Sequence, residues 1–158
     1  MKRYAVLFAS LLFVVSTLSH AAPLEELGDL SGAKWNNSGG KRKVLLYFWA
    51  SWCTDCKSKL KGDLHAMTKK FQDLAVVTVN IDQDIERARH YVEKESVKLP
   101  VLRDDAKSFR KMLKVFSVPH WAVFERVNGD WNLVDTAPAF EWDRVSKAIK
   151  KGAVKHAY

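Results

Sequence analysis

Two cysteines, Cys53 and Cys56, lie three positions apart directly after one of the most apolar stretches of the chain. A pair at this spacing can carry reversible redox chemistry, contribute to a metal site or link two nearby points of the backbone. A link across so short a loop removes little entropy from the unfolded chain, so its value as a stabiliser is small. Its value as a reversible switch is larger.

The residues around the pair predict a strand that is followed by a helix. Residues 44–50 are a continuous apolar run of β-branched and aromatic residues, which is typical of a strand buried on both faces. A second buried strand is expected at 76–81, so the unit is βαβ with parallel strands. Between them, apolar residues recur at intervals of three and four on one face of a helix: Leu60, Leu64, Met67, Phe71 and Leu74.

In this arrangement Cys53 lies where the strand ends and the helix begins. Backbone N–H groups without intrahelical partners then point at its sulfur, and the helix dipole favours negative charge there. The thiolate is the form that attacks a disulfide, and Cys56, one turn into the helix, is close enough to attack the resulting mixed disulfide. We therefore predict that Cys53 is the nucleophile and Cys56 the resolving thiol.

The two residues between the cysteines, Thr54 and Asp55, are expected to tune the redox couple. The Asp55 carboxylate disfavours the Cys53 thiolate, which destabilises the reduced form and favours a reducing protein. Lys57 and Lys59 act in the opposite sense, but their side chains are long and well hydrated.

The rest of the chain predicts an α/β fold, in which helices cover both faces of a mixed sheet. Two helices are expected around 85–92 and 109–116, separated by a short extended piece at 98–102. Asn128-Gly129 predicts an antiparallel hairpin, because both residues tolerate the positive φ of a type I′ turn. A closing helix is expected at 142–149, and a short strand pair around Leu30 and Trp35.

The order of these landmarks resembles the thioredoxin superfamily, in particular its exported TlpA/ResA-type thioredoxin-like thiol:disulfide oxidoreductases, over roughly residues 24–152. The resemblance rests on Phe-Trp-Ala-Ser-Trp-Cys-Thr-Asp-Cys-Lys at 48–57, on Val-Asn-Ile-Asp-Gln at 79–83, on the helical insert before Val118-Pro119 and on the Asn128-Gly129 hairpin. It implies a thioredoxin-like fold with a central mixed β-sheet flanked by helices and a helical insert before the strand that follows a cis-proline.

The resemblance also implies roles for individual residues. Pro119 would be the cis-proline that lies against a Cys53–Cys56 disulfide, and the backbone of Val118 would pair with an extended substrate segment. Trp52 would border the substrate groove, while Trp49 would pack beneath it.

Three positions depart from the family pattern. Tyr47 replaces the buried aspartate that thioredoxins commonly carry six residues before the first cysteine, and Lys59 replaces the glutamate of the ResA-like proteins six residues after it. Lys61 stands where a helix-kinking proline is expected. The group that handles the proton therefore stays open between Tyr47, Glu125 and water.

His120 follows Pro119 and, in a thioredoxin fold, would lie near Cys53. It could donate a proton, tune the thiol or complete a soft-metal site with both cysteines, but no fourth ligand is evident. A surface histidine beside a groove also needs no special role, and we expect no metal. The spacing of four aspartates does not match a calcium loop and favours capping or turn roles: Asp82, Asp84, Asp104 and Asp105.

The N-terminal residues 1–21 have the pattern of a signal peptide. Lys2 and Arg3 precede an apolar run from Tyr4 to Val15, and Ser-His-Ala at 19–21 suits cleavage after Ala21. An uncleaved membrane anchor is the alternative, but the run is short for a span. Residues 22–158 would then be a single domain, which their length supports.

The sequence thus predicts an exported, periplasmic thiol:disulfide oxidoreductase that reduces protein disulfides and has no cofactor besides its own disulfide. The resemblance implies a membrane electron donor of the DsbD/CcdA type and substrates such as apocytochrome c, in cytochrome c maturation, or metal-site assembly proteins. The alternatives are an oxidant that introduces disulfides and a copper- or zinc-binding accessory module. The net charge of +8 is spread without aromatic stacking patterns, so a nucleic-acid partner is not expected.

Overall fold

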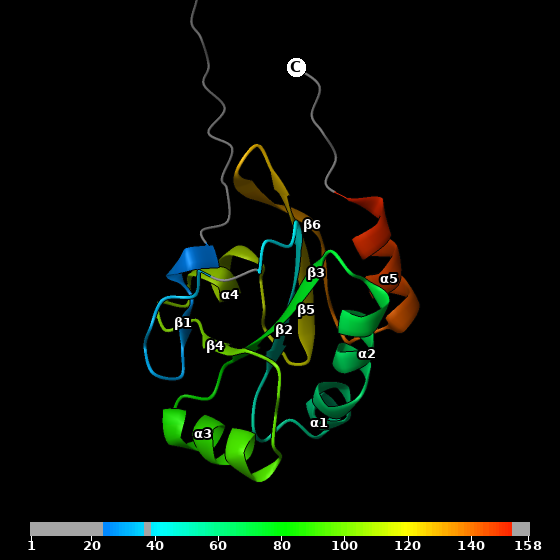
Figure 1. Cartoon of the computed structure of the whole chain (residues 1–158). Coiled ribbons are helices and arrows are strands. Elements are labelled where there is room, and N and C mark those ends of the chain that lie inside the picture. The colour runs from blue at the N-terminus through cyan, green and yellow to red at the C-terminus, as the bar shows by residue number, and fades with distance from the viewer. Residues whose placement is uncertain (1–23, 37–38, 153–158) are drawn as a thin grey trace, which may run out of the picture.

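The centre of the fold is β2 (Lys43–Trp49), the strand that leads into the cysteine pair. The computed structural model describes residues 24–36 and 39–152, and within them six strands form one mixed sheet in the order β1-β4-β3-β2-β5-β6 (Figure 1). β2 and β4 are parallel to β3, whereas β5 is antiparallel to β2 and β6, and β1 to β4. The other strands are β1 (Gly28–Asp29), β3 (Leu74–Asn80), β4 (Val101–Arg103), β5 (His120–Val127) and β6 (Asp130–Pro138).

The two faces of β2 supply two separate cores. Because successive side chains of a strand point to opposite faces, Leu45, Tyr47 and Trp49 enter one buried cluster, and Val44, Leu46 and Phe48 the other. The first cluster is covered by α1 (Thr54–Lys61), α2 (Asp63–Lys70) and α5 (Trp142–Lys151), on the right in Figure 1. The second is covered by the N-terminal segment and by α4 (Ser108–Met112). The predicted α/β fold with helices on both faces is confirmed.

The helix after the cysteines differs from the prediction in two respects. The single helix expected there is interrupted at Gly62, whose φ of −122° and ψ of −78° lie outside the helical region, so it becomes α1 and α2. Its expected extension to Leu74 is wrong, because Phe71 adopts an extended backbone and Leu74 begins β3. Leu74 still enters the same core from the strand, which is why the apolar spacing ran past the end of the helix.

The insert between β3 and β5 contains the two expected helices, α3 (Ile85–Lys94) and α4, with β4 between them. Asp84 caps α3 by accepting the N–H of Glu86, and the Asp104 carboxylate accepts the N–H groups of Phe109 and Arg110 in α4. The capping roles expected for these two aspartates are thus present.

Two apolar residues that the spacing predicted on one face of the insert's second helix, Met112 and Phe116, are exposed. The helix α4 ends at Met112, and Lys114 adopts a left-handed backbone with a φ of 54°. Phe116 is 91% exposed as a result. A left-handed residue turns the chain out of the helix, so the apolar spacing no longer keeps Phe116 on the buried side.

The C-terminal hairpin and helix follow the prediction. Asn128 and Gly129 have φ values of 54° and 94° between β5 and β6, and α5 closes the described chain. The expected strand pair near the N-terminus is reduced to one bridge between Gly28 and Lys34, and β1 pairs with β4 along its other edge. In the described ranges, no helix has both the length and the apolar character that a membrane span needs.

Candidate active site

The cysteine pair forms a disulfide at the N-terminus of α1. Cys53 is the N-cap residue, and its Sγ accepts a hydrogen bond from the backbone N–H of Cys56 at 3.2 Å. Its own N–H donates to the carbonyl of Ala50 at 3.0 Å. When the pair is reduced, the Cys56 N–H and the helix dipole would stabilise a thiolate on Cys53.

The two sulfurs differ in access. Cys53 is 6% exposed, whereas Cys56 is completely buried. Thr54 and Asp55, the residues between them, are exposed on the first turn of α1. Trp52, one residue before the pair, is 63% exposed, whereas Trp49 is fully buried and its ring lies 5.1 Å from that of Tyr91.

A buried carboxylate fixes the segment that precedes Cys53. Asp82, just beyond β3, accepts hydrogen bonds from the backbone N–H of Ser51 at 2.9 Å and from its hydroxyl at 3.1 Å. The side-chain amide of Asn80 donates to the same carboxylate at 2.8 Å, and its oxygen accepts the N–H of Asp82. The sequence reading missed this link, although polar residues at the ends of two adjacent parallel strands are a signal for it.

The Val118–Pro119 peptide bond is cis. The register of β2 with β5 pairs Phe48 with His120, so the residues just before His120 lie beside the end of β2, from which the cysteine segment continues. Val118 is half-buried and packs against the core cluster that contains both cysteines. The structure therefore brings Val118 and Pro119 to the same end of the sheet as the disulfide.

The His120 side chain lies on the opposite face of the sheet from Tyr47. It contacts the ring of Phe48 edge-on at 6.2 Å, and its Nε2 is 2.9 Å from the hydroxyl of Thr136. That hydroxyl donates its proton to the carbonyl of Trp121, so Nε2 of His120 is the donor to Thr136. Burial lowers the pKa of His120.

The structure does not assemble a metal site from His120 and the cysteines. Across residues 24–36 and 39–152, no three side chains of the types His, Cys, Asp and Glu lie close enough together to hold a metal ion. The histidine instead has the hydrogen bond to Thr136 as its polar contact.

Tyr47, which stands in place of the thioredoxin aspartate, is completely buried in the cluster that holds both cysteines. Within the described residues, its hydroxyl has no hydrogen-bond partner, and its ring contacts Phe140 edge-on at 5.8 Å. Burial raises the pKa of Tyr47, and the carboxylates of Asp63 and Asp55 raise it further. Tyr47 thus stays protonated near neutral pH and can donate a hydrogen bond, but the raised pKa disfavours transfer of its proton to a thiolate.

Glu125, the other side chain considered for proton transfer, lies far from the disulfide. It pairs in register with Lys43, the first residue of β2, and forms ion pairs with Arg42 at 3.2 Å and Lys43 at 3.9 Å. The disulfide follows the last residue of β2, about 20 Å away along an extended strand. This distance leaves Tyr47 and water as the candidates.

The two lysines at family-atypical positions form ion pairs on the surface of α1 and α2. Lys59 contacts Asp63 at 2.6 Å, and its Nζ lies 5.7 Å from the centre of the Phe140 ring. Lys61 pairs with Glu95, which raises the pKa of Lys61 and lowers that of Glu95. The position where the ResA-like pattern has a glutamate thus carries a lysine that is ion-paired with Asp63.

The sheet order and the disulfide at a helix N-terminus define a thioredoxin-fold thiol:disulfide oxidoreductase. The family profile described as thioredoxin-like matches residues 40–130, which is more than half of the chain. The chain belongs to the thioredoxin-like family.

Similar proteins carry names of the same kind. The thioredoxin-like protein YneN of Bacillus subtilis (strain 168) is 34% identical over 88 residues, which are 52% of this chain and 51% of YneN. The chain thus matches about half the length of that relative. The sporulation thiol-disulfide oxidoreductase A of the same organism is 22% identical over 133 residues, covering 75% of this chain and 80% of the relative.

A solved structure is similar over nearly its whole length. The pneumococcal exposed lipoprotein thioredoxin Etrx1, from Streptococcus pneumoniae strain TIGR4, superposes with a TM-score of 0.64 and 30% sequence identity. The match covers 79% of this chain and 96% of Etrx1.

Proposed function

We propose that this protein is an exported reductant of protein disulfides, with Cys53 as the nucleophile and Cys56 as the resolving thiol. The observation that carries the proposal is the disulfide at the N-terminus of α1, with the more accessible sulfur on Cys53 and an acidic residue, Asp55, in the first turn. Asp55 contributes to the raised pKa of Tyr47, so its field reaches the cluster that holds both sulfurs. A carboxylate there disfavours the thiolate and makes the dithiol the better electron donor.

The reaction transfers two electrons from the reduced protein to a disulfide of its substrate. The Cys53 thiolate attacks one substrate sulfur, forms a mixed disulfide and expels the other substrate sulfur as a thiolate, which takes up a proton. The Cys56 thiolate then attacks the sulfur of Cys53 and releases the second substrate thiol. The products are a substrate dithiol and the internal disulfide, which a donor must reduce again.

The assignment of the two cysteines is tested by trapping. Cys56→Ser should accumulate a mixed disulfide between Cys53 and a substrate protein, because the resolving thiol is absent. Cys53→Ser should accumulate none, and both should lack turnover. Stable mixed disulfides on Cys56 in the Cys53→Ser variant, and none in the other, would reverse the two roles.

The direction of electron flow is tested by the reduction potential of the couple, titrated with glutathione and dithiothreitol and followed by tryptophan fluorescence. A reductant should have a potential near or below about −270 mV, the value of thioredoxin. A value near about −120 mV would contradict this direction and assign the protein as an oxidant. Failure of the pair to cycle, together with tight copper or zinc binding, would favour the accessory metal module.

Export is proposed from residues 1–21, which lie outside the described part of the chain, with residues 22–158 as the mature single domain. The similarity to Etrx1, which is described as an exposed lipoprotein, supports an extracytoplasmic, for example periplasmic, location. Mass spectrometry of the mature protein should find an N-terminus at Ala22. A protein retained in the cytoplasm with residues 1–21 intact would contradict the proposal.

The partners follow from the compartment. A reductant outside the cytoplasm needs a membrane electron donor, which we propose to be of the DsbD/CcdA type, and substrates with cysteine pairs, such as apocytochrome c or metal-site assembly proteins. Deleting the donor should leave the Cys53–Cys56 pair oxidised in cells, as thiol labelling would detect. Substrates trapped on Cys56→Ser that contain no cysteine pair would exclude this class.

A further inference from the structure

A pocket of about 740 Å³ opens beside the exposed indole of Trp52, the residue that directly precedes Cys53. Its other walls come from the residues after β3, from the first turn of α3 and from the segment that joins β4 to α4. These segments come from the insert that separates β3 from β5. A substrate segment attached to Cys53 would pass over Trp52 and reach this pocket.

The pocket is lined by charged side chains of both signs, but its carboxylates already have partners. Asp82 accepts the hydrogen bonds of Ser51 and Asn80, and Asp84 caps α3. The third, Asp105, forms an ion pair with Arg103 at 2.8 Å.

Two of the cations that line the pocket have no such partner. Arg87, in α3, and Lys107, the N-cap residue of α4, are exposed and face the pocket from its two sides. Within residues 24–36 and 39–152, neither side chain has a carboxylate within ion-pair distance, whereas Arg103 and Arg110 are paired with Asp105 and Asp104. The pocket therefore offers two unpaired positive charges on the walls that it shares with Trp52.

We propose that this pocket binds an acidic side chain of the substrate protein, and that Arg87 and Lys107 thereby select substrates with an acidic residue close to the target cysteine. The inference rests on the proposed reductase function. The lining has four cations and three carboxylates, so a substrate carboxylate in the pocket meets an excess of positive charge, whereas a lysine or arginine there is repelled by it. Because Trp52 lines the pocket and directly precedes Cys53, the acidic residue of the substrate lies within a few residues of its cysteine.

The test compares two disulfide peptides that differ only in a Glu or a Gln about three residues from one cysteine. The wild-type protein should reduce the Glu peptide with a kcat/KM about two- to fivefold higher, the size expected for a solvent-exposed ion pair. About 0.5 M salt should remove the difference, because it screens such pairs. Arg87→Gln and Lys107→Gln should each diminish the preference for Glu, measured as the ratio of kcat/KM for the Glu and Gln peptides.

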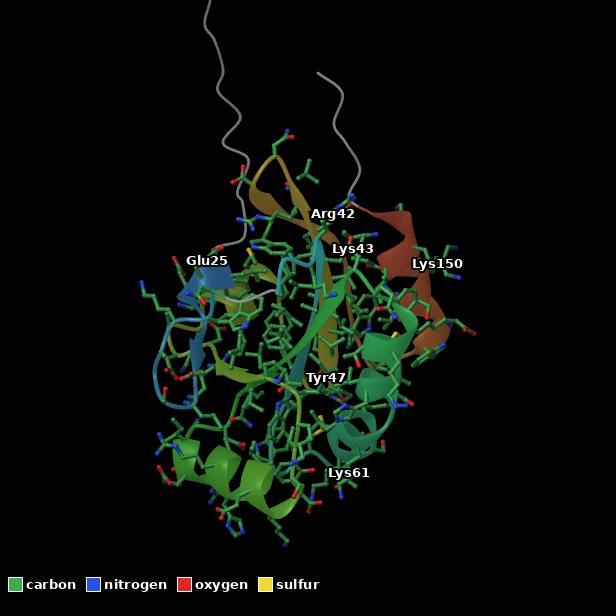
Figure 2. The ribbon with its side chains drawn as sticks, viewed as in Figure 1. Glu25, Arg42, Lys43, Tyr47, Lys61 and Lys150 are labelled. Atoms are coloured by element: carbon green, nitrogen blue, oxygen red, sulfur yellow. A yellow bond between two sulfur atoms is a disulfide. The ribbon has the colours of Figure 1, made fainter. Side chains whose placement is uncertain are left out.

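Lys150→Gln provides the matched control, because it removes one exposed positive charge from α5, well away from the pocket (Figure 2). It should keep the preference for Glu. The double variant Arg87→Glu/Lys107→Glu should prefer a Lys peptide over the Glu peptide. Equal reduction of the Glu and Gln peptides by the wild type, or an equal loss of preference in Lys150→Gln, would overturn the proposal.

A binding measurement separates this proposal from the reductase function. Versions of the two peptides with serine in place of cysteine are titrated onto the oxidised protein and followed by tryptophan fluorescence. A two- to fivefold tighter binding of the Glu version, lost in Arg87→Gln/Lys107→Gln, supports the pocket even if no peptide is reduced. Absence of that difference overturns the pocket, whereas failure to reduce any disulfide overturns only the proposed function.

Discussion

Asp55 is the charged residue between the two cysteines in the sequence, in the first turn of α1, and its carboxylate is expected to affect the Cys53 thiolate. We predict that Asp55→Asn makes the reduction potential less negative by about 5 to 20 mV. The reason is that the neutral amide no longer disfavours the Cys53 thiolate. A charge in the first turn of a helix changes the free energy by about 0.3–1 kcal/mol. The predicted shift follows because about 30 mV corresponds to 1.4 kcal/mol for this couple. Equilibration with glutathione gives the value.

Asp143→Asn is the control for this prediction. It removes the same charge from the first turn of α5, which does not carry the disulfide. Its potential should equal that of the wild type. A more negative potential in Asp55→Asn would show that the carboxylate acts on the thiol in another way, for example by accepting a hydrogen bond.

His120 should make the stability of the protein sensitive to mild acid. Burial lowers the pKa of His120 below its ordinary value of about 6.5, so between the two values the unfolded chain binds more protons than the folded one. The free energy of unfolding should therefore fall as the pH drops from about 6.5 through the folded pKa. His120→Gln keeps an N–H donor for Thr136 but does not titrate, so it should lose less stability between about pH 7.5 and about pH 5.

Urea unfolding at the two pH values measures this effect. Glu95 and Asp29 also have shifted pKa values, but both are lowered from values near 4, so they act below this window. An equal loss of stability in the wild type and in His120→Gln would mean that another group is responsible.

The hydrogen bonds of Asp82, which join the ends of β2 and β3, hold the segment that precedes Cys53. We predict that Asp82→Ala lowers the free energy of unfolding by about 2–4 kcal/mol, because it leaves the Ser51 N–H and the Asn80 amide without their buried acceptor. The amide of Ser51 should also exchange its hydrogen faster.

Ser51→Ala is the matched variant, because it keeps the backbone hydrogen bond and removes only that of the hydroxyl. Ser51→Ala should lower the free energy of unfolding by about 1 kcal/mol. If both variants lower the free energy of unfolding by the same amount, the hydrogen bond from the Ser51 N–H to Asp82 contributes nothing. Asp82 would then not be what holds the segment before Cys53.

The strands could be read from the sequence because each long one carries its own local pattern. The apolar run of β2 and the turn at Asn128-Gly129 are examples, and both are present in the structure. The end of a helix is harder to read, since Leu74 fills the same core from a strand that it would fill from a helix. Phe116 was misplaced because one left-handed residue, Lys114, redirects the chain without any apolar signal.

The candidate site was predictable only in part. The cysteine pair and its position at a helix start follow from the residues, whereas Val118 and Pro119 were named only through the family resemblance. The contact between Ser51 and Asp82 joins residues far apart in the chain and depends on strand register, which no local pattern gives. The side-chain direction of His120 also depends on strand register, and it points to the face of the sheet opposite Tyr47.

For the whole molecule, the N-terminal segment is part of the folded core. Leu24 and Leu27 are buried against the second cluster, beside Trp35 and the α4 residues. We predict that Leu27→Ala lowers the free energy of unfolding by about 2–4 kcal/mol, since it leaves a cavity in that core. Urea denaturation checks the value.

Glu25→Ala is the control, because this neighbouring side chain is exposed. It should change the stability by about 0.5 kcal/mol or less. A negligible effect of Leu27→Ala would mean that the segment can leave the core freely. The proposed cleavage after Ala21 keeps both leucines in the mature protein.

The direction of β2 separates the disulfide from both ends of the described chain. In Figure 2, Glu25 and Lys150 lie toward the same end of the molecule as Lys43, whereas Tyr47 and Lys61 lie toward the other, where the strand leads into the cysteines. The protein can therefore be attached to a resin or an electrode through either terminus with the sulfurs facing the solution. Coupled in this way, and with the proposed roles of the two cysteines, Cys56→Ser would serve as an affinity matrix from which a mild thiol releases the bound proteins.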